Sequence, residues 1–383
     1  MENKRIYVDV HVLQTVPPSC VNRDDTGSPK TAIYGGTTRA RVSSQSWKRA
    51  MRLMFRELLP SEMIGVRTKK IVSMIADEIH KLDANANAEV LAQVILTNAG
   101  LKLKPPKKGK KGNEGLEEIE GIEGAEGTGA LFFLSVAQAK ALAKLAVEDP
   151  ETTKEKPSKE AKEKVQNALK QSPSVDIALF GRMVADDPSL NTDACAQVAH
   201  SISTHKVSNE YDYFTAVDDL SEEDSAGAGH LGTVEFNSST LYRYATVAVH
   251  ELHSQLGDDA VGAVNQFIRA FVCSMPTGKQ NTFANRTLPD AILVTIRKDQ
   301  PINFVGAFEK PVPTSDEGYV SDSAKRLVAH ARSIYNSFAK EPVLSLVTGD
   351  LLSGLGSAQP LDESLVLCAE GLRKYLANGG IRQ

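Results

Sequence analysis

Apolar and polar residues alternate at the amino end of the chain. Isoleucine or valine stands at positions 6, 8, 10 and 12, and the positions between them hold mostly polar side chains such as Asp9 and His11. A period of two is typical of a strand that buries one face. We therefore expect a half-buried strand from Arg5 to Val16, which Pro17-Pro18 ends before a polar loop that runs to Gly35-Gly36.

Helical spacing follows a short strand expected at Arg39–Val42. Apolar residues recur every three or four positions from Trp47 to Leu58, and Ser43 or Ser44 stands where a helix N-cap is favoured. The same spacing predicts further helices at 68–82, 88–98, 136–147, 158–171, 258–275, 322–339 and 363–378. Strands are expected at 174–179, 198–207, 233–236, 241–249 and 291–297.

A long and mostly helical interruption separates the first strand and helix from the remaining strands. Without it, the order resembles βαββαβ, the ferredoxin-like arrangement shared by RNA-recognition domains, so the predicted fold class is α+β. Within the interruption, residues 104–129 begin with the basic block Lys107–Lys111 and turn into Glu/Gly-rich sequence. So few large apolar residues predict a mobile loop.

Length and composition favour a large soluble protein. At 383 residues the chain exceeds one ordinary domain, so we expect two domains, or one with a large insertion. No stretch is apolar enough to span a bilayer, and the amino end lacks the apolar block of a signal peptide. The four cysteines lie far apart, which favours reduced thiols in a cytoplasmic protein. We expect no metal ion and no cofactor.

Charge is distributed unevenly along the chain. Residues 1–56 hold ten basic and four acidic side chains, a local charge of +6. Because the whole chain carries −4, the remaining residues carry −10. A basic segment in an acidic protein points to a polyanionic partner.

The most informative segment is the start of the helix expected after Val42. A helix N-terminus favours a phosphate, and Ser43, Gln45 and Ser46 add hydrogen-bonding side chains there. Lys48 and Arg52 are four residues apart and lie on one helix face. The preceding loop adds Arg23 and Lys30, and Gly35-Gly36 would let a backbone come close to the ligand. The alternative is a capped helix whose basic residues are only a solvated face.

Other candidate residues are weaker. The aromatic side chains of Tyr211, Tyr213 and Phe214 could stack on bases, or could pack under a loop. His200 and His205 lack neighbouring metal ligands and, in a strand, point to opposite faces. The pair Asp24-Asp25 could hold a divalent metal for phosphodiester cleavage, although such carboxylates more often cap a loop.

Several motifs together resemble the CasC family, the repeated backbone subunit of the type I-E CRISPR surveillance complex Cascade. They are PSCVNRDD at 18–25, IYGG at 33–36, RVSSQSWKRAMR at 41–52, VDIALFGRM at 175–183, FTAVDDL at 214–220 and HLG at 230–232. The resemblance implies a modified RNA-recognition palm, inserted helical fingers and a projecting thumb. The implied boundaries are palm at 1–59, 173–195 and 236–383, fingers at 60–172, and thumb at 196–235.

The resemblance also implies a function and a set of site residues. About six copies stack head to tail along a CRISPR guide RNA, hold its phosphates without reading sequence, and present its bases to target DNA beside the other Cascade subunits. The implied RNA contacts are Arg23, Lys30, Arg41, Ser43, Gln45, Ser46, Lys48, Arg49, Arg52 and Met183, the last beside a kinked nucleotide. The implied base-displacing thumb residues are Phe214, Thr215, Val217, His230 and Leu231.

Two functions of different classes therefore remain open. The first is a non-catalytic scaffold for guide RNA. The second is a metal-dependent endoribonuclease that uses Asp24 or Asp25, since related backbone subunits of other CRISPR types cut RNA. A third class, a metabolic enzyme with an anionic substrate, would bind a small molecule saturably and show no preference for RNA.

Overall fold

The chain folds into two compact units. The computed structural model describes residues 5–104, 127–128, 131–184, 187–216 and 230–378. Unit 1 comprises residues 1–55, 196–253 and 258–383, and unit 2 comprises residues 56–195 and 254–257. Most of the loop predicted at 104–129 lies outside the described residues; its ends form the short strands β5 (Leu103–Lys104) and β6 (Gly127–Thr128), which pair with each other.

Unit 1 is built on a nine-stranded antiparallel sheet in the described part of the chain. Seven strands follow the order β13-β12-β1-β11-β9-β3-β2, while β8 and β10 also pair with β11. The strands are β1 (Tyr7–Ser19), β2 (Thr31–Tyr34), β3 (Thr37–Val42), β8 (Ala196–Val198), β9 (Ser201–Ser203), β10 (Glu210–Ala216), β11 (His230–Ala248), β12 (Ala291–Arg297) and β13 (Leu344–Thr348). The helices that begin in this unit are α1 (Ser44–Leu58), α7 (Val249–Leu256), α8 (Asp259–Cys273), α9 (Gln280–Phe283), α10 (Gly318–Ser337) and α11 (Leu361–Asn378), with short 3-10 turns at Phe304–Phe308 and Asp350–Leu355.

The element order agrees with the one read from the sequence. In chain order β1, α1, β9, β11, α8 and β12 give βαββαβ, and in the sheet the four strands stand as β12-β1-β11-β9 with every pairing antiparallel. The chain is therefore an α+β protein, as predicted.

The first strand is buried on both faces, so the expectation of one solvated face is wrong. Val8, Val10 and Val12 are fully buried, and so are Asp9 and His11 between them. The polar face is covered by the segment 302–308 and by α10, since the Ile302 amide donates to Asp9 Oδ2 and Phe304 stacks on His11. Asp9 and His11 alternate with valines whether or not they are covered. The sequence pattern alone therefore could not reveal that a second layer packs on this face of β1.

Helices α1 and α8 lie on the other face of this sheet. Trp47 of α1 is fully buried, and its indole Nε1 donates to the Ser201 hydroxyl at 2.9 Å. The guanidinium of Arg243, on β11, lies 3.7 Å from the Trp47 ring centroid and 4.5 Å from that of Phe271 in α8. These cation–π contacts join both helices to the central strand.

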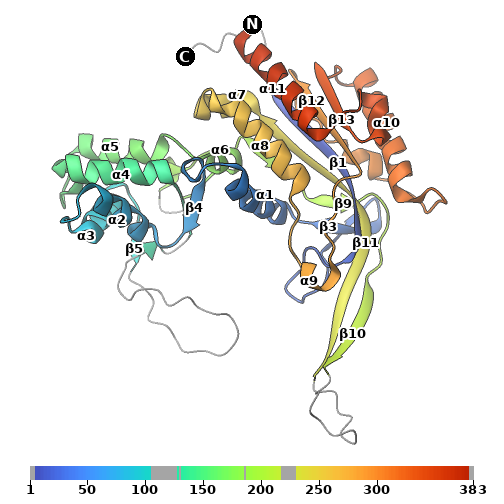
Figure 1. The fold of residues 1–383 in the computed structure, drawn as a ribbon, viewed down its shortest axis with the longest axis horizontal. Helices are drawn as coiled ribbons and strands as arrows, with labels where there is room; N and C mark the ends of the chain where they lie inside the picture. The colour runs from blue at the N-terminus through green and yellow to red at the C-terminus, as the bar shows by residue number, and fades with distance from the viewer. Residues whose placement is uncertain (1–4, 105–126, 129–130, 185–186, 217–229, 379–383) are drawn as a thin grey trace, which may run out of the picture. The chain divides into compact units, whose positions relative to one another are not determined.

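Strands β10 and β11 continue past the sheet as a hairpin (Figure 1). The two strands expected at 233–236 and 241–249 are one strand of 19 residues. Its carboxyl part pairs with β1 and its amino part pairs with β10. One element therefore belongs both to the central sheet and to the projecting hairpin.

Unit 2 is mainly helical and has its own apolar core. Its elements are β4 (Gly65–Thr68), α2 (Ile71–Leu82), α3 (Ala88–Asn98), β7 (Phe132–Ser135), α4 (Val136–Glu148), α5 (Lys159–Lys170) and α6 (Val175–Phe180), with 3-10 turns at Ser61–Met63, Pro150–Thr153 and Pro188–Leu190. The strand predicted at 174–179 is wrong because this segment forms α6, which Gly181 ends with a positive φ of 77°. Because five of the six residues of α6 are buried, the segment shows no period that distinguishes a strand from a helix.

Candidate nucleic-acid interface

A tight loop carries the first candidate residues in unit 1. The Asp24 amide donates to the Ser28 carbonyl, and the Lys30 amide donates to the Asn22 carbonyl. The Asp24 carboxylate accepts from the Thr26 amide, the Thr26 hydroxyl and the Ser28 amide. The Thr26 hydroxyl in particular holds the pKa of Asp24 below its ordinary value. Asp24 thus closes the loop, which leaves Arg23 exposed at its start.

This loop is fastened to the strand and helix that carry the other candidates. The Asn22 side-chain oxygen accepts from the Ser43 amide at 2.9 Å, and the Lys30 carbonyl accepts from the Arg41 amide at 2.9 Å. These two bonds bring together Lys30, the end of β3 and the start of α1. Residues far apart in the sequence motif are therefore neighbours in the fold.

The amino end of α1 is capped within the protein. The Ser43 hydroxyl is buried and accepts from the Ser46 amide at 3.3 Å, so Ser43 is the N-cap. The Ser44 amide donates to Nδ1 of His200 at 3.2 Å. Two of the first amides of the helix are thus already bonded, and Gln45 and Ser46 remain as side chains exposed or partly exposed at this end.

Cationic side chains follow this helix end. Arg49 is exposed, while Lys48 and Arg52 are partly buried beside the apolar stripe that includes Trp47 and Met51. Partial burial lowers the pKa of Lys48. The spacing of four residues places Lys48 and Arg52 on one face, as expected from the sequence.

Two features that the sequence suggested as ligand-facing serve the fold instead. Gly35 and Gly36 both have positive φ, the requirement of a type I′ turn between β2 and β3. A Cβ on Gly35 would lie 1.7 Å from the Glu309 carbonyl oxygen, so its close contact is with the chain's own backbone. Arg39, one of the ten basic residues of the amino segment, is fully buried.

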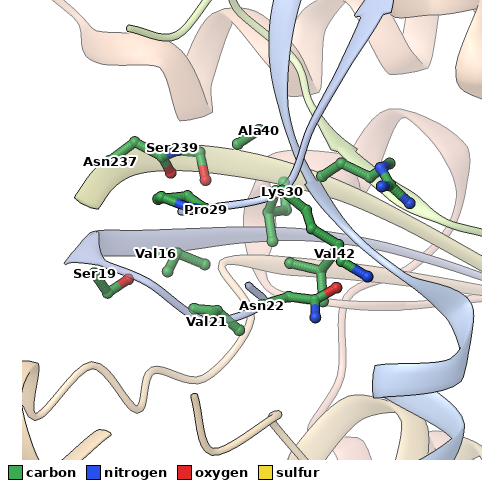
Figure 2. A pocket seen from close by; sticks show the side chains of 12 residues that line it. Val16, Ser19, Val21, Asn22, Pro29, Lys30, Ala40, Val42, Asn237 and Ser239 are labelled. Atoms are coloured by element: carbon green, nitrogen blue, oxygen red, sulfur yellow. The ribbon is translucent and has the colours of Figure 1, made fainter. Parts of the chain in front are cut away.

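A small pocket lies between the loop and the sheet. Its cavity of about 20 Å³ is the room that one ordered water needs. Figure 2 shows Asn237 and Ser239 toward one end of it and Asn22 and Lys30 toward the other. A cavity of this size is too small for a nucleobase. Its polar lining suits an ordered water beside a polar ligand.

Two further residues lie in this region: His200, which the sequence suggested only as a weak metal-ligand candidate, and Lys279, which it did not single out. His200 contacts Ser44 and lies 3.5 Å from Arg41. Lys279 has a left-handed backbone, with φ of 50°. Burial raises the pKa of the Cys20 thiol, and the positive charges of Arg23 and Lys279 oppose that rise. Gly278 packs so closely on the Cys20 and Val21 carbonyls that any Cβ would overlap them. In the sequence, only the Gly278-Lys279 pair could have indicated a turn that packs closely on residues 20 and 21.

Met183 belongs to unit 2 and is 84% exposed. Its neighbour Arg182 is buried and donates to the carbonyls of Phe133, Leu169 and Leu190. Burial lowers the pKa of Arg182 to about 10. The structure thus exposes the Met183 side chain next to a buried and fully engaged arginine.

The hairpin separates its aromatic residues between two faces. Phe214 pairs with Gly232, and a Cβ on that glycine would lie 2.5 Å from the Phe214 ring. Tyr211 and Tyr213 point to the opposite face and are 68% and 70% exposed. Thr215 is exposed, and His230 and Leu231 contribute backbone to β11. Val217 and the side chains of His230 and Leu231 lie outside the described residues.

The described residues contain neither a cluster of metal ligands nor a helix that could span a membrane. No three His, Cys, Asp or Glu side chains among them gather in an arrangement that could hold a metal ion. His205 is buried and stacks on Tyr319, consistent with a structural histidine. None of the helices in that part of the chain is both long and apolar enough to cross a membrane.

Comparisons with known proteins agree with the sequence motifs. The family model described as CT1975-like protein matches residues 8–364. A chain of a "CRISPR RNA-guided surveillance complex, pre-nicking" is 35% identical, with a TM-score of 0.77, and the match covers 95% of this chain and 99% of that one. A chain of a "CRISPR RNA-guided surveillance complex" is 28% identical, with a TM-score of 0.59 and the same coverage. No curated protein sequence matches the chain significantly.

The family match spans most of the chain and includes every segment that carries the CasC motifs. The chain therefore belongs to the CT1975-like family, the CasC backbone subunits of type I-E CRISPR Cascade complexes.

Proposed function

We propose that this chain is a non-catalytic subunit that polymerises along CRISPR guide RNA and binds its phosphates regardless of sequence. The observation that carries the proposal is the fastening of the loop 22–30 to β3 and α1. It gathers Arg23, Lys30 and Arg41 beside the polar start of α1. The proposal is supported by the match, over 95% of the chain, to a chain of an RNA-guided surveillance complex.

The chemistry of these side chains suits a guide of arbitrary sequence. Lysine and arginine attract phosphates, which all nucleotides share, so contacts of this kind position the strand without reading it. The bases then face away from the protein and select target DNA by Watson–Crick pairing. Specificity comes from the guide, and the protein supplies a uniform track.

The proposal includes the division of labour within the chain. Unit 1 supplies the palm, and the hairpin of β10 and β11 supplies the thumb. Unit 2 supplies the fingers. The same compact unit also contains residues 173–195, which the resemblance assigned to the palm. Met183 wedges beside a kinked nucleotide, and Phe214 and its neighbours displace one base of the guide held by the next copy.

Assembly follows from the same arrangement. A thumb that acts on the neighbouring copy makes a head-to-tail contact, which repeats along the guide without closing into a dimer. We propose about six copies, joined by the other Cascade subunits. We also propose a cytoplasmic location, supported by the four free cysteines.

The endoribonuclease alternative receives no support from the geometry of its proposed residues. The Asp24 carboxylate is engaged by Thr26 and Ser28 of its own loop. The test is incubation of the purified protein with labelled RNA and magnesium. Cleavage that disappears in Asp24→Ala or Asp25→Ala would establish the enzyme and overturn the scaffold.

The proposed RNA contacts are tested with Lys48→Ala and Arg52→Ala. Each variant should weaken binding equally for unrelated RNA sequences and reduce the slope of log K against log salt by about 0.7 per lost phosphate contact. The control is Lys144→Ala, an exposed lysine of α4 that pairs with Glu148. A loss that depends on RNA sequence, or an equal loss in the control, would contradict backbone recognition at α1.

A further inference from the structure

His200 lies beside two of the residues around the proposed RNA contacts, Arg41 and Ser44. The residue is exposed, and it lies between β8 and β9. Its Nδ1 is 3.2 Å from the Ser44 amide and 3.5 Å from the Arg41 guanidinium. Partial burial of the ring lowers the pKa of His200, and the positive charges of Arg41 and Lys30 lower it further.

The neighbours of the ring fix its tautomer. An amide N–H and a guanidinium can only donate, so Nδ1 must act as an acceptor and carries no proton. The proton of the neutral ring is then on Nε2, at the opposite edge of the imidazole. His200 therefore holds the first turn of α1 with one nitrogen and has an N–H donor on the other.

We propose that Nε2–H of His200 donates a hydrogen bond to a phosphate oxygen of the bound guide strand. This inference rests on the proposed function. The acceptor is a phosphate because Arg41 and Lys30, the cations beside the ring, concentrate anions there. The contact is made by a neutral group, which distinguishes it from those of the surrounding lysines and arginines.

Two isosteric substitutions separate the roles of the two nitrogens. In His200→Asn the amide oxygen replaces Nδ1, so the bond to Ser44 is kept and the outer donor is lost. In His200→Gln the amide nitrogen replaces Nε2, so the outer donor is kept and the bond to Ser44 is lost. His80→Asn, at an exposed histidine of α2, is the matched control.

Binding of labelled single-stranded RNA to the full chain is measured by fluorescence anisotropy at several salt concentrations. We expect His200→Asn to weaken binding about tenfold, the value of one hydrogen bond to a charged acceptor. Its melting temperature and salt slope should stay those of the original protein, because no charge is removed. His200→Gln should bind RNA more tightly than His200→Asn and melt at a lower temperature.

The outcomes distinguish this inference from the proposed function. If His200→Asn binds like the original protein while Lys48→Ala is weakened, the His200 contact is refuted and the scaffold stands. If neither variant is weakened, the proposed function fails as well. Equal losses in His200→Asn and His200→Gln, both with lowered melting temperature, would reduce His200 to a structural residue.

The same assay with single-stranded DNA of matching sequence identifies the acceptor. A phosphate is common to both strands, so His200→Asn should weaken RNA and DNA by the same factor. A loss confined to RNA would overturn the phosphate assignment in favour of the ribose 2′-hydroxyl.

Discussion

The guanidinium of Arg39 donates to the Ser203 carbonyl oxygen at 2.9 Å. The same side chain donates to the carbonyls of Phe308 and Glu309, and it is fully buried. Two residues further along β3, Arg41 is partly exposed, and its Nε donates to the Thr31 carbonyl. One strand therefore carries a structural arginine and a surface arginine only two positions apart.

Substitution of these two arginines should have opposite consequences. Arg39→Ala leaves the buried carbonyl oxygens of Ser203 and Phe308, and the partly buried one of Glu309, without this donor. We therefore expect a loss of about 3 kcal/mol or more in the free energy of unfolding. Arg41→Ala should change stability by less than about 0.5 kcal/mol and weaken RNA binding several-fold. Thermal unfolding and RNA titration of both variants measure the contrast.

Each of these variants is the control for the other. Arg39→Ala protein that remains folded should bind RNA with the original salt slope, because its charge faces the protein interior. A destabilised Arg41→Ala, or a salt slope that drops only in Arg39→Ala, would show that the two roles are assigned the wrong way round.

Much of the fold was predictable where one periodicity dominates a long segment. The helix expected at 88–98 and the strand expected at 291–297 have the observed bounds. Strands β2 and β13 are four and five residues long, too short for a periodic signal. The segment 174–179 is apolar on nearly all sides, so only its Gly181 end could have indicated a helix.

The candidate site was predictable as a set of residues but not as a set of contacts. Charge, spacing and motif pointed to the loop and to α1. They could not reveal that Arg39 is buried, because its neighbours on β3 alternate in the same way as on any surface strand. They also could not reveal that His200 lies beside Ser44, since 156 residues separate the two and only the sheet brings them together.

The hairpin allows a prediction about base displacement. Phe214→Ala should leave the protein folded and alter the pattern of guide bases that are reactive to chemical probes in the assembled complex. The ring itself must do this work, because Glu210, Asp212 and Glu235 on the same hairpin give no attraction to phosphates. Tyr213→Ala, on the opposite face, is the control. If only Tyr213→Ala altered the pattern, the displacing side chain would lie on the opposite face of the hairpin, and the role proposed for Phe214 would be wrong.

Asp9 makes the free energy of unfolding depend on pH, because its protonated form is the one that the fold favours. Burial raises its pKa to about 6, although the Ile302 amide and the Tyr244 hydroxyl donate to it. Because this folded pKa exceeds the unfolded value near 3.8, the stabilisation is complete below pH 4 and is lost as pH rises through 6.

Asp9→Asn removes this titration while its amide can still accept from Ile302 and donate to Tyr244. Relative to the original protein, we expect the variant to gain about 2–3 kcal/mol of unfolding free energy between pH 4 and pH 7. Chemical denaturation at intervals of half a pH unit measures the difference. Parallel pH profiles for the two proteins would show that Asp9 ionises freely in the folded state.

His11, two residues along the same face of β1, has the opposite effect. Its Nδ1 lies 2.9 Å from the Tyr242 hydroxyl, whose oxygen accepts from the Phe304 amide, so the hydroxyl proton goes to His11. Burial lowers the pKa of His11 to about 3. The folded pKa lies below the unfolded value of 6.5, so the stabilisation is complete above pH 6.5 and falls by about 1.4 kcal/mol per unit as the pH drops.

Between pH 4 and pH 6 the effects of Asp9 and His11 on stability should therefore cancel in the original protein, and single substitutions should expose them separately. Asp9→Asn leaves His11 alone, so its stability should fall as pH decreases from 6 to 4. His11→Asn, whose amide oxygen can still accept from Tyr242, leaves Asp9 alone, so its stability should rise over the same range. The two denaturation series must have slopes of opposite sign. Slopes of the same sign would mean that the covering segment 302–308 does not keep water from this face of β1.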